Sequence, residues 1–453
     1  MLRTRFLFAL AVTLLAGVFY FPPPSRPYWF DEVYTAHMST FRRPLLDYLK
    51  GAYEDPHPPL YYLLARAWAQ ALGGMDPGGK EPPGNEGLMR GLSSLIGVVS
   101  VGYLAFRVHP VAGLLLLGSP AWATKVAEAR MYPLLGLLAL MAYVELRRSV
   151  LLSSFLGLLA LYTQYLALFF AGWFALFALA ARRVRETWPY LLYLPWVPVI
   201  LAVSAGGTNA HLRPNPISNT AALGELAGYP MGLALLSLVA YAALVAARRG
   251  QVREAFWLLI PTLAVLSWWV SGYWVNTASP RYWGAFLPLL AASVGVALGW
   301  VRWRKVFLVL LTASGLAGLA WWQSEGGIRV YAADEGYQVS RALLEAVVRK
   351  QGEVTVLVNE TGRAMALRYY IRDERIRIEV PGSGYREAPW EGKYAAFYIF
   401  YPYIGLENAP NLWELAWHLK EKGCRVRFQF FSTSALALTH CPGTVGDTRR
   451  FFP

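Results

Sequence analysis

Residues 131–183 read MYPLLGLLALMAYVELRRSVLLSSFLGLLALYTQYLALFFAGWFALFALAARR, and this stretch decides the fold class. Three apolar runs fill it, at 131–146, 149–163 and 165–181, and arginines stand where two of these runs end. A helix needs about 20 mostly apolar residues to cross the hydrocarbon core of a bilayer, with a range of roughly 17–25. Apolar runs near this length in close succession predict a polytopic α-helical membrane protein.

The composition of the whole chain agrees with this class. Of the 453 residues, 56% are hydrophobic and only 15% are charged, whereas soluble domains carry about 25% charged residues. The 18 Trp and 27 Tyr suit aromatic belts at two membrane interfaces. A net charge of +14 also raises the class of nucleic-acid-binding proteins, but the basic residues stand in short clusters between apolar runs, as in cytoplasmic loops. We therefore expect membrane lipids, and no nucleic acid, as partners.

The same search along the chain predicts about 11 transmembrane helices. Arg3 and Arg5 precede the first apolar run as in a signal peptide, but three prolines at 22–24 replace the small residues of a cleavage site. An uncleaved first helix is therefore the stronger interpretation. The predicted spans lie near 5–21, 88–106, 110–124, 131–146, 149–163, 165–181, 188–204, 229–247, 254–271, 282–301 and 305–322.

A twelfth run, at 59–73, decides the orientation. If this run lies in the membrane interface, the basic clusters between the later spans face the cytoplasm. If the run crosses the membrane, all of these clusters lie outside, against the positive-inside rule. Arg66 and Gln70 interrupt its aromatic, apolar face, as in a helix at the headgroups. We therefore expect a cytoplasmic N-terminus, an external loop at 22–87 with interfacial helices, and an extracytoplasmic C-terminal domain. The clusters comprise Arg107, Arg147, Arg148, Arg182, Arg183, Arg185, Arg248, Arg249, Arg253, Arg302, Arg304 and Lys305.

Beyond a membrane domain at 1–325, residues 326–453 predict a small soluble α/β domain. Helices at 336–350, 362–371 and 411–422 alternate with strands at 354–358, 375–380, 394–401, 424–430 and 434–440. If residues 430 and 435 pair across a short turn, Cys424 stands opposite Cys441, close enough for a disulfide. A disulfide would agree with an extracytoplasmic position, and two buried free cysteines are the alternative.

Polar residues gather at the predicted outer ends of the spans, in four places. In the first, Asp31 and Glu32 are adjacent carboxylates beside an aromatic anchor, an arrangement that suits general-base chemistry; a solvated acidic turn is the alternative. In the second, His57 precedes Pro58 and Pro59, which fix an extended start to the interfacial helix. An ordinary helix start is the alternative there.

The other two places combine arginine with tyrosine. Glu128, Arg130 and Tyr132 stand at the outer start of a span, where a surface ion pair is the alternative. Arg281 and Tyr282 follow in a short external loop, where an arginine breaks the positive-inside trend. Its planar fork suits a phosphate group, and snorkelling to lipid headgroups is the alternative. No His/Cys cluster has the spacing of a zinc site, so no cofactor is assigned.

Taken together, the four places resemble the bacterial C-type integral-membrane glycosyltransferases, in the protein-mannosyltransferase and aminoarabinose-transferase-like group. The resemblance covers roughly residues 1–325 and rests on Asp-Glu at 31–32 with Tyr34, His-Pro-Pro-Leu-Tyr-Tyr at 57–62, Glu-Ala-Arg-Met-Tyr at 128–132 and Pro-Arg-Tyr at 280–282. The mannosyltransferases usually continue His-Pro-Pro-Leu with Gly-Lys, and the lipid A modifiers carry Lys in place of His. The acceptor, whether protein, lipid or glycan, therefore stays open.

The resemblance implies transfer of a hexosyl or pentosyl group from a polyprenyl-phosphate-linked donor to a hydroxyl acceptor on the extracytoplasmic face. It implies that Asp31 is the base that deprotonates the acceptor, with Glu32 in support. Fixed cations would neutralise the departing phosphate where water is scarce. Metal use varies in this group, so a divalent cation is neither assigned nor excluded. The residues that would bind substrate are Tyr34, His57, Glu128, Arg130, Tyr132, Arg281 and Tyr282.

Two other functions suit a polytopic membrane protein. A lipid or glycan transporter should keep ionisable residues within its spans and have repeated or broken helices. Inserting each such residue at the centre of a span costs about 2.5–3.5 kcal/mol, so they are kept only where they have a function. The apolar runs hold almost none at their centres, and the sequence has no apparent internal repeat. A non-enzymatic assembly protein has no need of Asp31 and Glu32. A transferase is therefore the expected function.

Overall fold

A computed structural model of the chain describes residues 2–21, 23, 28–40, 57–73, 85–205, 232–272, 282, 284–324, 336–358, 361–380, 395–400, 417, 419–421, 423–431 and 434–440. The chain forms two compact units. The first comprises Met1–Pro24, Arg43–Trp68 and Gly87–Arg329, and the second comprises Ser25–Arg42, Ala69–Glu86 and Val330–Pro453. Parts of the predicted external loop thus belong to the second unit, and the predicted domain boundary near residue 325 stays a prediction.

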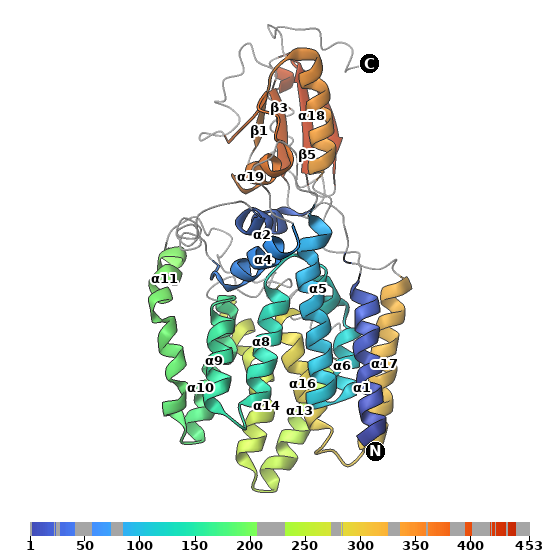
Figure 1. The fold of residues 1–453 in the computed structure, drawn as a ribbon, viewed down its shortest axis with the longest axis vertical. Coiled ribbons are helices and arrows are strands. Elements are labelled where there is room, and N and C mark those ends of the chain that lie inside the picture. The colour runs from blue at the N-terminus through green and yellow to red at the C-terminus, as the bar shows by residue number, and fades with distance from the viewer. Residues whose placement is uncertain are drawn as a thin grey trace. The chain divides into compact units, whose positions relative to one another are not determined.

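The first unit is helical (Figure 1). Three of its described helical stretches, Arg3–Tyr20, Glu86–Val108 and Val252–Ser271, are long and apolar enough to cross a membrane. The number of 11 spans stays a prediction. The elements are α1 (Leu2–Tyr20), α4 (Leu60–Ala71), α5 (Glu86–Tyr103), η1 (Leu104–Val108), α6 (Pro110–Leu117), α7 (Pro120–Val126), α8 (Tyr132–Glu145), α9 (Val150–Leu161), η2 (Tyr165–Ala167), α10 (Leu168–Ala180), η3 (Val184–Trp196), α11 (Val197–Ala205), α13 (Gly232–Arg248), α14 (Val252–Ser271), η5 (Gly284–Phe286), α16 (Leu287–Ala297) and α17 (Arg304–Ser324).

The predicted span at 110–124 is wrong as a single helix. α6 ends at Leu117, and α7 begins anew at Pro120, because proline has no N–H with which to continue the preceding helix. The hydroxyl of Ser119 caps α7 by accepting from the N–H of Trp122 at 3.3 Å. A continuous apolar run therefore does not by itself predict a continuous helix.

The ambiguous run at 59–73 forms the short helix α4. Its 12 residues span about 18 Å at 1.5 Å per residue, well below the roughly 30 Å of a hydrocarbon core. It is amphipathic: Tyr61 and Tyr62 are buried, whereas Leu64 is exposed.

Glycines allow the backbones of two elements to touch. α6 packs against both α1 and α17 (Figure 1). At the end of α6, a Cβ atom on Gly118 would stand 2.2 Å from the carbonyl oxygen of Gly315 in α17. A Cβ on Gly318 would stand 2.0 Å from the carbonyl oxygen of Gly118. Neither position accommodates any other residue without separating α17 from the α6–α7 break.

Replacing Gly318 with alanine is therefore expected to lower the free energy of unfolding by about 1–3 kcal/mol, the usual cost of overpacking. The thermal unfolding midpoint of the purified protein in a mild detergent measures the change. Gly172→Ala in α10 is the matched control, since nothing lies within 4 Å of a Cβ there. If the two variants unfold at the same temperature, the close approach of α6 and α17 does not limit the size of the side chain at position 318.

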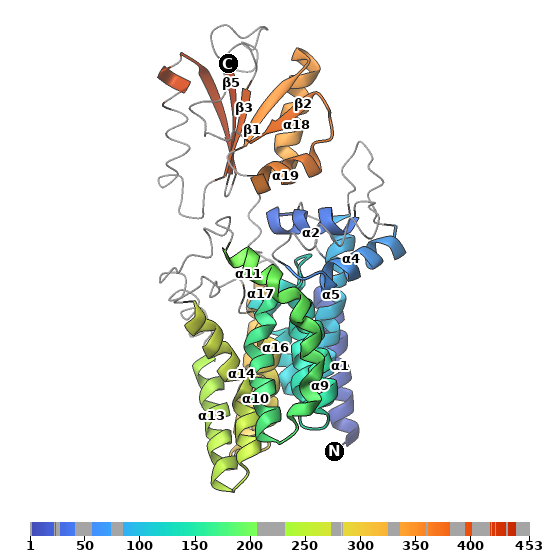
Figure 2. The same cartoon turned by 90° about the vertical axis from the view of Figure 1, so that its left-hand side faces the viewer.

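The second unit contains a mixed five-stranded sheet in the order β2-β1-β3-β5-β4. β1 pairs in parallel with β2 and β3, and β5 pairs antiparallel with β3 and β4. α18 and α19 pack against β1 and β2 (Figure 2). The elements are α2 (Phe30–Thr40), α18 (Tyr337–Gln351), β1 (Val354–Val358), α19 (Thr361–Tyr370), β2 (Ile376–Glu379), β3 (Ala395–Phe400), β4 (Arg425–Phe430) and β5 (Ser434–His440).

The strands and the two helices of the tail lie within about one residue of the sequence prediction. Of the predicted helix 411–422, only 417 and 419–421 are described, and they are helical. The last hairpin has the predicted register, with Phe430 opposite Ala435 and Arg425 opposite His440. Cys424 is disulfide-bonded, so the alternative of free cysteines is wrong for Cys424. Cys441 lies outside the described residues.

Candidate functional site

The two predicted catalytic carboxylates lie in the first turn of α2, in the second unit. Asp31 is 8% exposed and Glu32 is fully buried, so the alternative of a solvated acidic turn is wrong. Trp29 caps the helix: its N–H donates to Glu32 Oε2 at 3.3 Å, and its carbonyl accepts from the N–H groups of Glu32 and Val33. A glutamate that reaches back to the capping residue in this way is half of a capping box. Glu32 therefore has a structural task at the start of α2.

A buried cluster of tyrosines fixes the chain just before α2. The hydroxyls of Tyr28 and Tyr369 both donate to Asn85 Oδ1, at 2.9 and 3.1 Å. The backbone N–H of Tyr28 donates to the hydroxyl of Tyr370 at 2.7 Å, and that hydroxyl donates to Glu86 Oε1 at 3.3 Å. These bonds tie the start of α2 to the end of α19.

Burial raises the pKa of Tyr28 and of Tyr370 well above the usual tyrosine value, and nearby acidic groups add to the rise. Both hydroxyls are therefore neutral at physiological pH and remain hydrogen-bond donors. The cluster was not identified from the sequence, because the chain brings together residues up to 342 positions apart.

Replacing Tyr370 with phenylalanine is expected to lower the free energy of unfolding by about 1–3 kcal/mol, because the buried N–H of Tyr28 loses its acceptor. Thermal unfolding in detergent measures the loss. Tyr241→Phe serves as the control, since Tyr241 in α13 is about half exposed. Equal unfolding midpoints for the two variants would show that the tyrosine cluster does not hold α2.

The first unit holds a buried ion pair at the end of α7. Lys125 Nζ lies 3.3 Å from Glu128 Oε2, and the two side chains are only 6% and 1% exposed. Gly284 leaves room for the lysine, since a Cβ there would stand 2.8 Å from Lys125 Cγ. The alternative of a surface ion pair at Glu128 is therefore wrong.

Arg130 and Tyr132 are buried next to this pair. Lys125 Nζ lies 5.3 Å from the centroid of the Tyr132 ring, and the guanidinium carbon of Arg130 lies 5.9 Å from it. Both distances are within the range of cation–π attraction. Two cations thus share one aromatic ring, with the carboxylate of Glu128 beside them.

Lys125 is a charged residue that the sequence motifs do not include, because it stands between the predicted span at 110–124 and the motif at 128–132. The structure buries it in α7. A signal was present: Lys125 stands three residues before Glu128, a spacing that sets two side chains on one face of a helix. An ionisable residue at the edge of an apolar run is itself an indication of function in a membrane protein.

Two more predicted binding residues lie in the first unit. The Tyr282 ring is buried, with its centroid 5.9 Å from that of Tyr132. The ring of His57, just before α4, is half-buried and lies 6.4 Å from that of Tyr165. Arg281 lies outside the described residues.

The segment at 128–132 is tied to α4 and α5 through hydroxyl groups. The hydroxyls of Tyr61 and Ser93 lie 3.0 Å apart, and Ser93 donates to the carbonyl of Arg130 at 3.3 Å. In the second unit, Tyr34 is half-buried on α2. The structure thus assigns Asp31, Glu32 and Tyr34 to the second unit and the other described site residues to the first.

Each unit has its own chemical capacity. Lys125 and Arg130 in the first unit suit an anion such as a phosphate. The carboxylates of α2 in the second unit suit proton transfer. Among the described residues, no group of three or more His, Cys, Asp or Glu side chains is placed to hold a metal ion.

The chain shares the fold of ArnT, a member of the group that the sequence resembles, and three of its described helical stretches are long and apolar enough to cross a membrane. Two similar solved structures are of ArnT from Cupriavidus metallidurans. The structure bound to undecaprenyl phosphate matches with a TM-score of 0.57 and 13% identity, covering 97% of this chain and 99% of that one. The apo structure matches with a TM-score of 0.58 and 13% identity, covering 98% and 99%. No protein-family model and no curated protein matches the sequence.

Proposed function

We propose that this chain is a glycosyltransferase that moves a sugar from a polyprenyl-phosphate-linked donor to a hydroxyl acceptor on the extracytoplasmic face of the membrane. The observation that carries the proposal is the likeness of fold, over 97% of this chain, to ArnT bound to undecaprenyl phosphate. The buried charges in α2 and near the end of α7 support it, since such charges are costly to bury without a task.

Asp31 is the proposed base. It takes the proton of the acceptor hydroxyl as the acceptor oxygen bonds to the anomeric carbon of the donor sugar. The bond between that carbon and the phosphate oxygen breaks, and its electron pair leaves with the polyprenyl phosphate. Burial of Asp31 and its place in the first turn of α2 support this role, because a helix start orients its side chains and stabilises negative charge.

Lys125 and Arg130 are the proposed partners of the leaving phosphate, together with Arg281 on the strength of the sequence resemblance. A fixed cation stabilises a developing phosphate charge most where water is excluded, and both described cations are buried. Tyr132 lies against both of them, which limits their movement. His57, Glu128 and Tyr282 are proposed to shape the binding site for the donor.

A lipid carrier is the second candidate, and the buried pair of Lys125 and Glu128 favours it. A transporter keeps ionisable residues of this kind along its substrate path. Such a protein would bind a polyprenyl phosphate lipid and release it unchanged.

The test uses the purified chain in detergent and polyprenyl-phosphate donors that carry a labelled sugar, with a membrane extract as the source of acceptors. A transferase moves the label onto an acceptor and releases polyprenyl phosphate. In vesicles, a carrier moves the labelled donor between leaflets and leaves it intact. Movement of intact donor without any chemical turnover would replace the first candidate with the second.

A further inference from the structure

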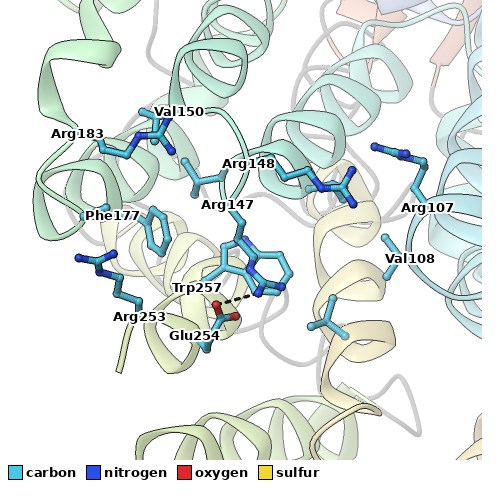
Figure 3. A pocket seen from close by; sticks show the side chains of 14 residues that line it. Arg107, Val108, Arg147, Arg148, Val150, Phe177, Arg183, Arg253, Glu254 and Trp257 are labelled. Carbon is cyan, nitrogen blue, oxygen red and sulfur yellow. Dashed lines mark ion pairs between the residues drawn. The ribbon is translucent and has the colours of Figure 1, made fainter. Parts of the chain in front are cut away.

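An arginine-lined cavity of about 530 Å³ lies in the first unit and shares no lining residue with the candidate functional site. It is lined by the end of η1, the turn from α8 to α9, the end of α10 and the start of α14, together with a residue of α16. Figure 3 shows the charged side chains around it. They are Arg107, Arg147, Arg148, Arg183, Arg253 and Glu254.

The cavity has an excess of positive charge. Three of its arginines have carboxylate partners: Arg107 pairs with Glu145 and Arg147 with Glu254, each at 2.9 Å, and Arg183 pairs with Glu186. Arg148 and Arg253 have no ion pair with any carboxylate in the described part of the chain. Both side chains are exposed, so their guanidinium groups are available to an anion.

One arginine is held in place before any ligand binds. Trp257 is buried and stacks on Tyr143, with the ring centroids 4.7 Å apart and the planes 7° from parallel. The guanidinium carbon of Arg147 lies 4.8 Å from the Trp257 ring, and Glu254 binds the same group. A guanidinium fixed on two sides loses little entropy when it binds a phosphate with its remaining N–H groups.

The remaining lining is apolar. Leu146, Val150 and Phe177 are buried side chains that face the cavity. An inorganic anion gains nothing from such walls, whereas a phospholipid carries a phosphate next to glycerol and acyl groups. A cavity with cations and apolar walls side by side therefore suits an anionic lipid better than a free anion.

We propose that this cavity binds the phosphate headgroup of an anionic phospholipid in the leaflet at the arginine-rich ends of the helices, which the predicted topology makes the cytoplasmic leaflet. Basic pockets between membrane helices on that side are a general mode of recognition for anionic headgroups. The lipid bridges the end of η1, the turn from α8 to α9, the end of α10 and the start of α14. The bound lipid stabilises the first unit and takes no part in sugar transfer.

The test measures thermal unfolding of the full-length, delipidated protein in a neutral detergent. Phosphatidylglycerol, phosphatidylcholine or inorganic phosphate is added in increasing concentration to wild type, to Arg148→Gln/Arg253→Gln and to the control Arg185→Gln/Arg249→Gln. The control removes two exposed arginines from the same predicted face, outside the cavity. Phosphatidylglycerol is expected to raise the unfolding midpoint of wild type and of the control at the same lipid concentration. The cavity variant is expected to need at least about tenfold more lipid, which corresponds to a loss of about 1.4 kcal/mol in binding.

Three results would overturn the proposal. Equal stabilisation of wild type by inorganic phosphate and by phosphatidylglycerol identifies a site for free anions. Equal responses of wild type and both variants identify a general effect of surface charge. An unchanged midpoint of wild type with phosphatidylglycerol shows that no such site exists.

Discussion

The Asp31→Asn variant is expected to turn over the lipid-linked donor about 10²–10⁴-fold more slowly than wild type, the usual contribution of a general base. Asparagine keeps the shape of the side chain but cannot take the acceptor proton. Because α2 retains its cap at Trp29 and Glu32, the variant should unfold at nearly the wild-type temperature. Steady-state release of polyprenyl phosphate, together with thermal unfolding, measures both quantities.

Glu32→Gln is the matched control for this variant. Glu32 accepts the N–H of Trp29, and glutamine keeps an oxygen for that bond but loses the negative charge that favours a helix start, so the replacement should weaken the start of α2 by only about 0.3–1 kcal/mol. Its turnover should fall less than that of Asp31→Asn. Equal turnover of wild type and Asp31→Asn, or a larger loss in Glu32→Gln, would remove Asp31 from the role of base.

The second large effect is expected from Lys125→Met. Methionine fills a similar volume but leaves the carboxylate of Glu128 buried without the cation that lies 3.3 Å away. Breaking a buried ion pair by removing one partner costs about 3–5 kcal/mol. Thermal unfolding should therefore shift strongly downward, and donor turnover should fall with it.

A double variant separates the structural role of Lys125 from its role toward the phosphate. Lys125→Met/Glu128→Gln removes both charges, so most of the lost stability should return. Donor turnover should stay low, because the cation for the leaving phosphate is still missing. If the double variant is as active as wild type, Lys125 only balances the charge of Glu128.

The tail illustrates what a sequence can predict. Strands such as Val354–Val358 consist of β-branched and apolar residues, and the turn between 430 and 435 sets the register of its hairpin. These signals are local, so they were read correctly from neighbouring residues. The edge strand β4 also carries Arg425 and Arg427, which discourage pairing with another chain.

The features that were missed depend on contacts between distant residues. The close packing of α6 on α17 is one of them, since Gly315 and Gly318 lie against Gly118. The tyrosine cluster joins Tyr28 to Tyr370, and no periodicity connects them. For the candidate site, the sequence motifs propose Asp31, Glu128 and Arg130 but do not predict their burial. They also leave out Lys125, the partner of Glu128, because it lies outside every motif.

The most direct measurement of the central claim follows oxygen in a single reaction. Purified protein is incubated with a polyprenyl-phosphate sugar in water enriched in ¹⁸O, so that water takes the place of the acceptor hydroxyl, and the lipid product is weighed by mass spectrometry. Attack at the anomeric carbon leaves the phosphate oxygens unlabelled, so the expected lipid product is polyprenyl phosphate without ¹⁸O. Wild type is expected to form this product much faster than Asp31→Asn does. Polyprenyl phosphate that carries ¹⁸O, or donor that stays intact with every sugar tried, would contradict the assignment of this chain as a glycosyltransferase.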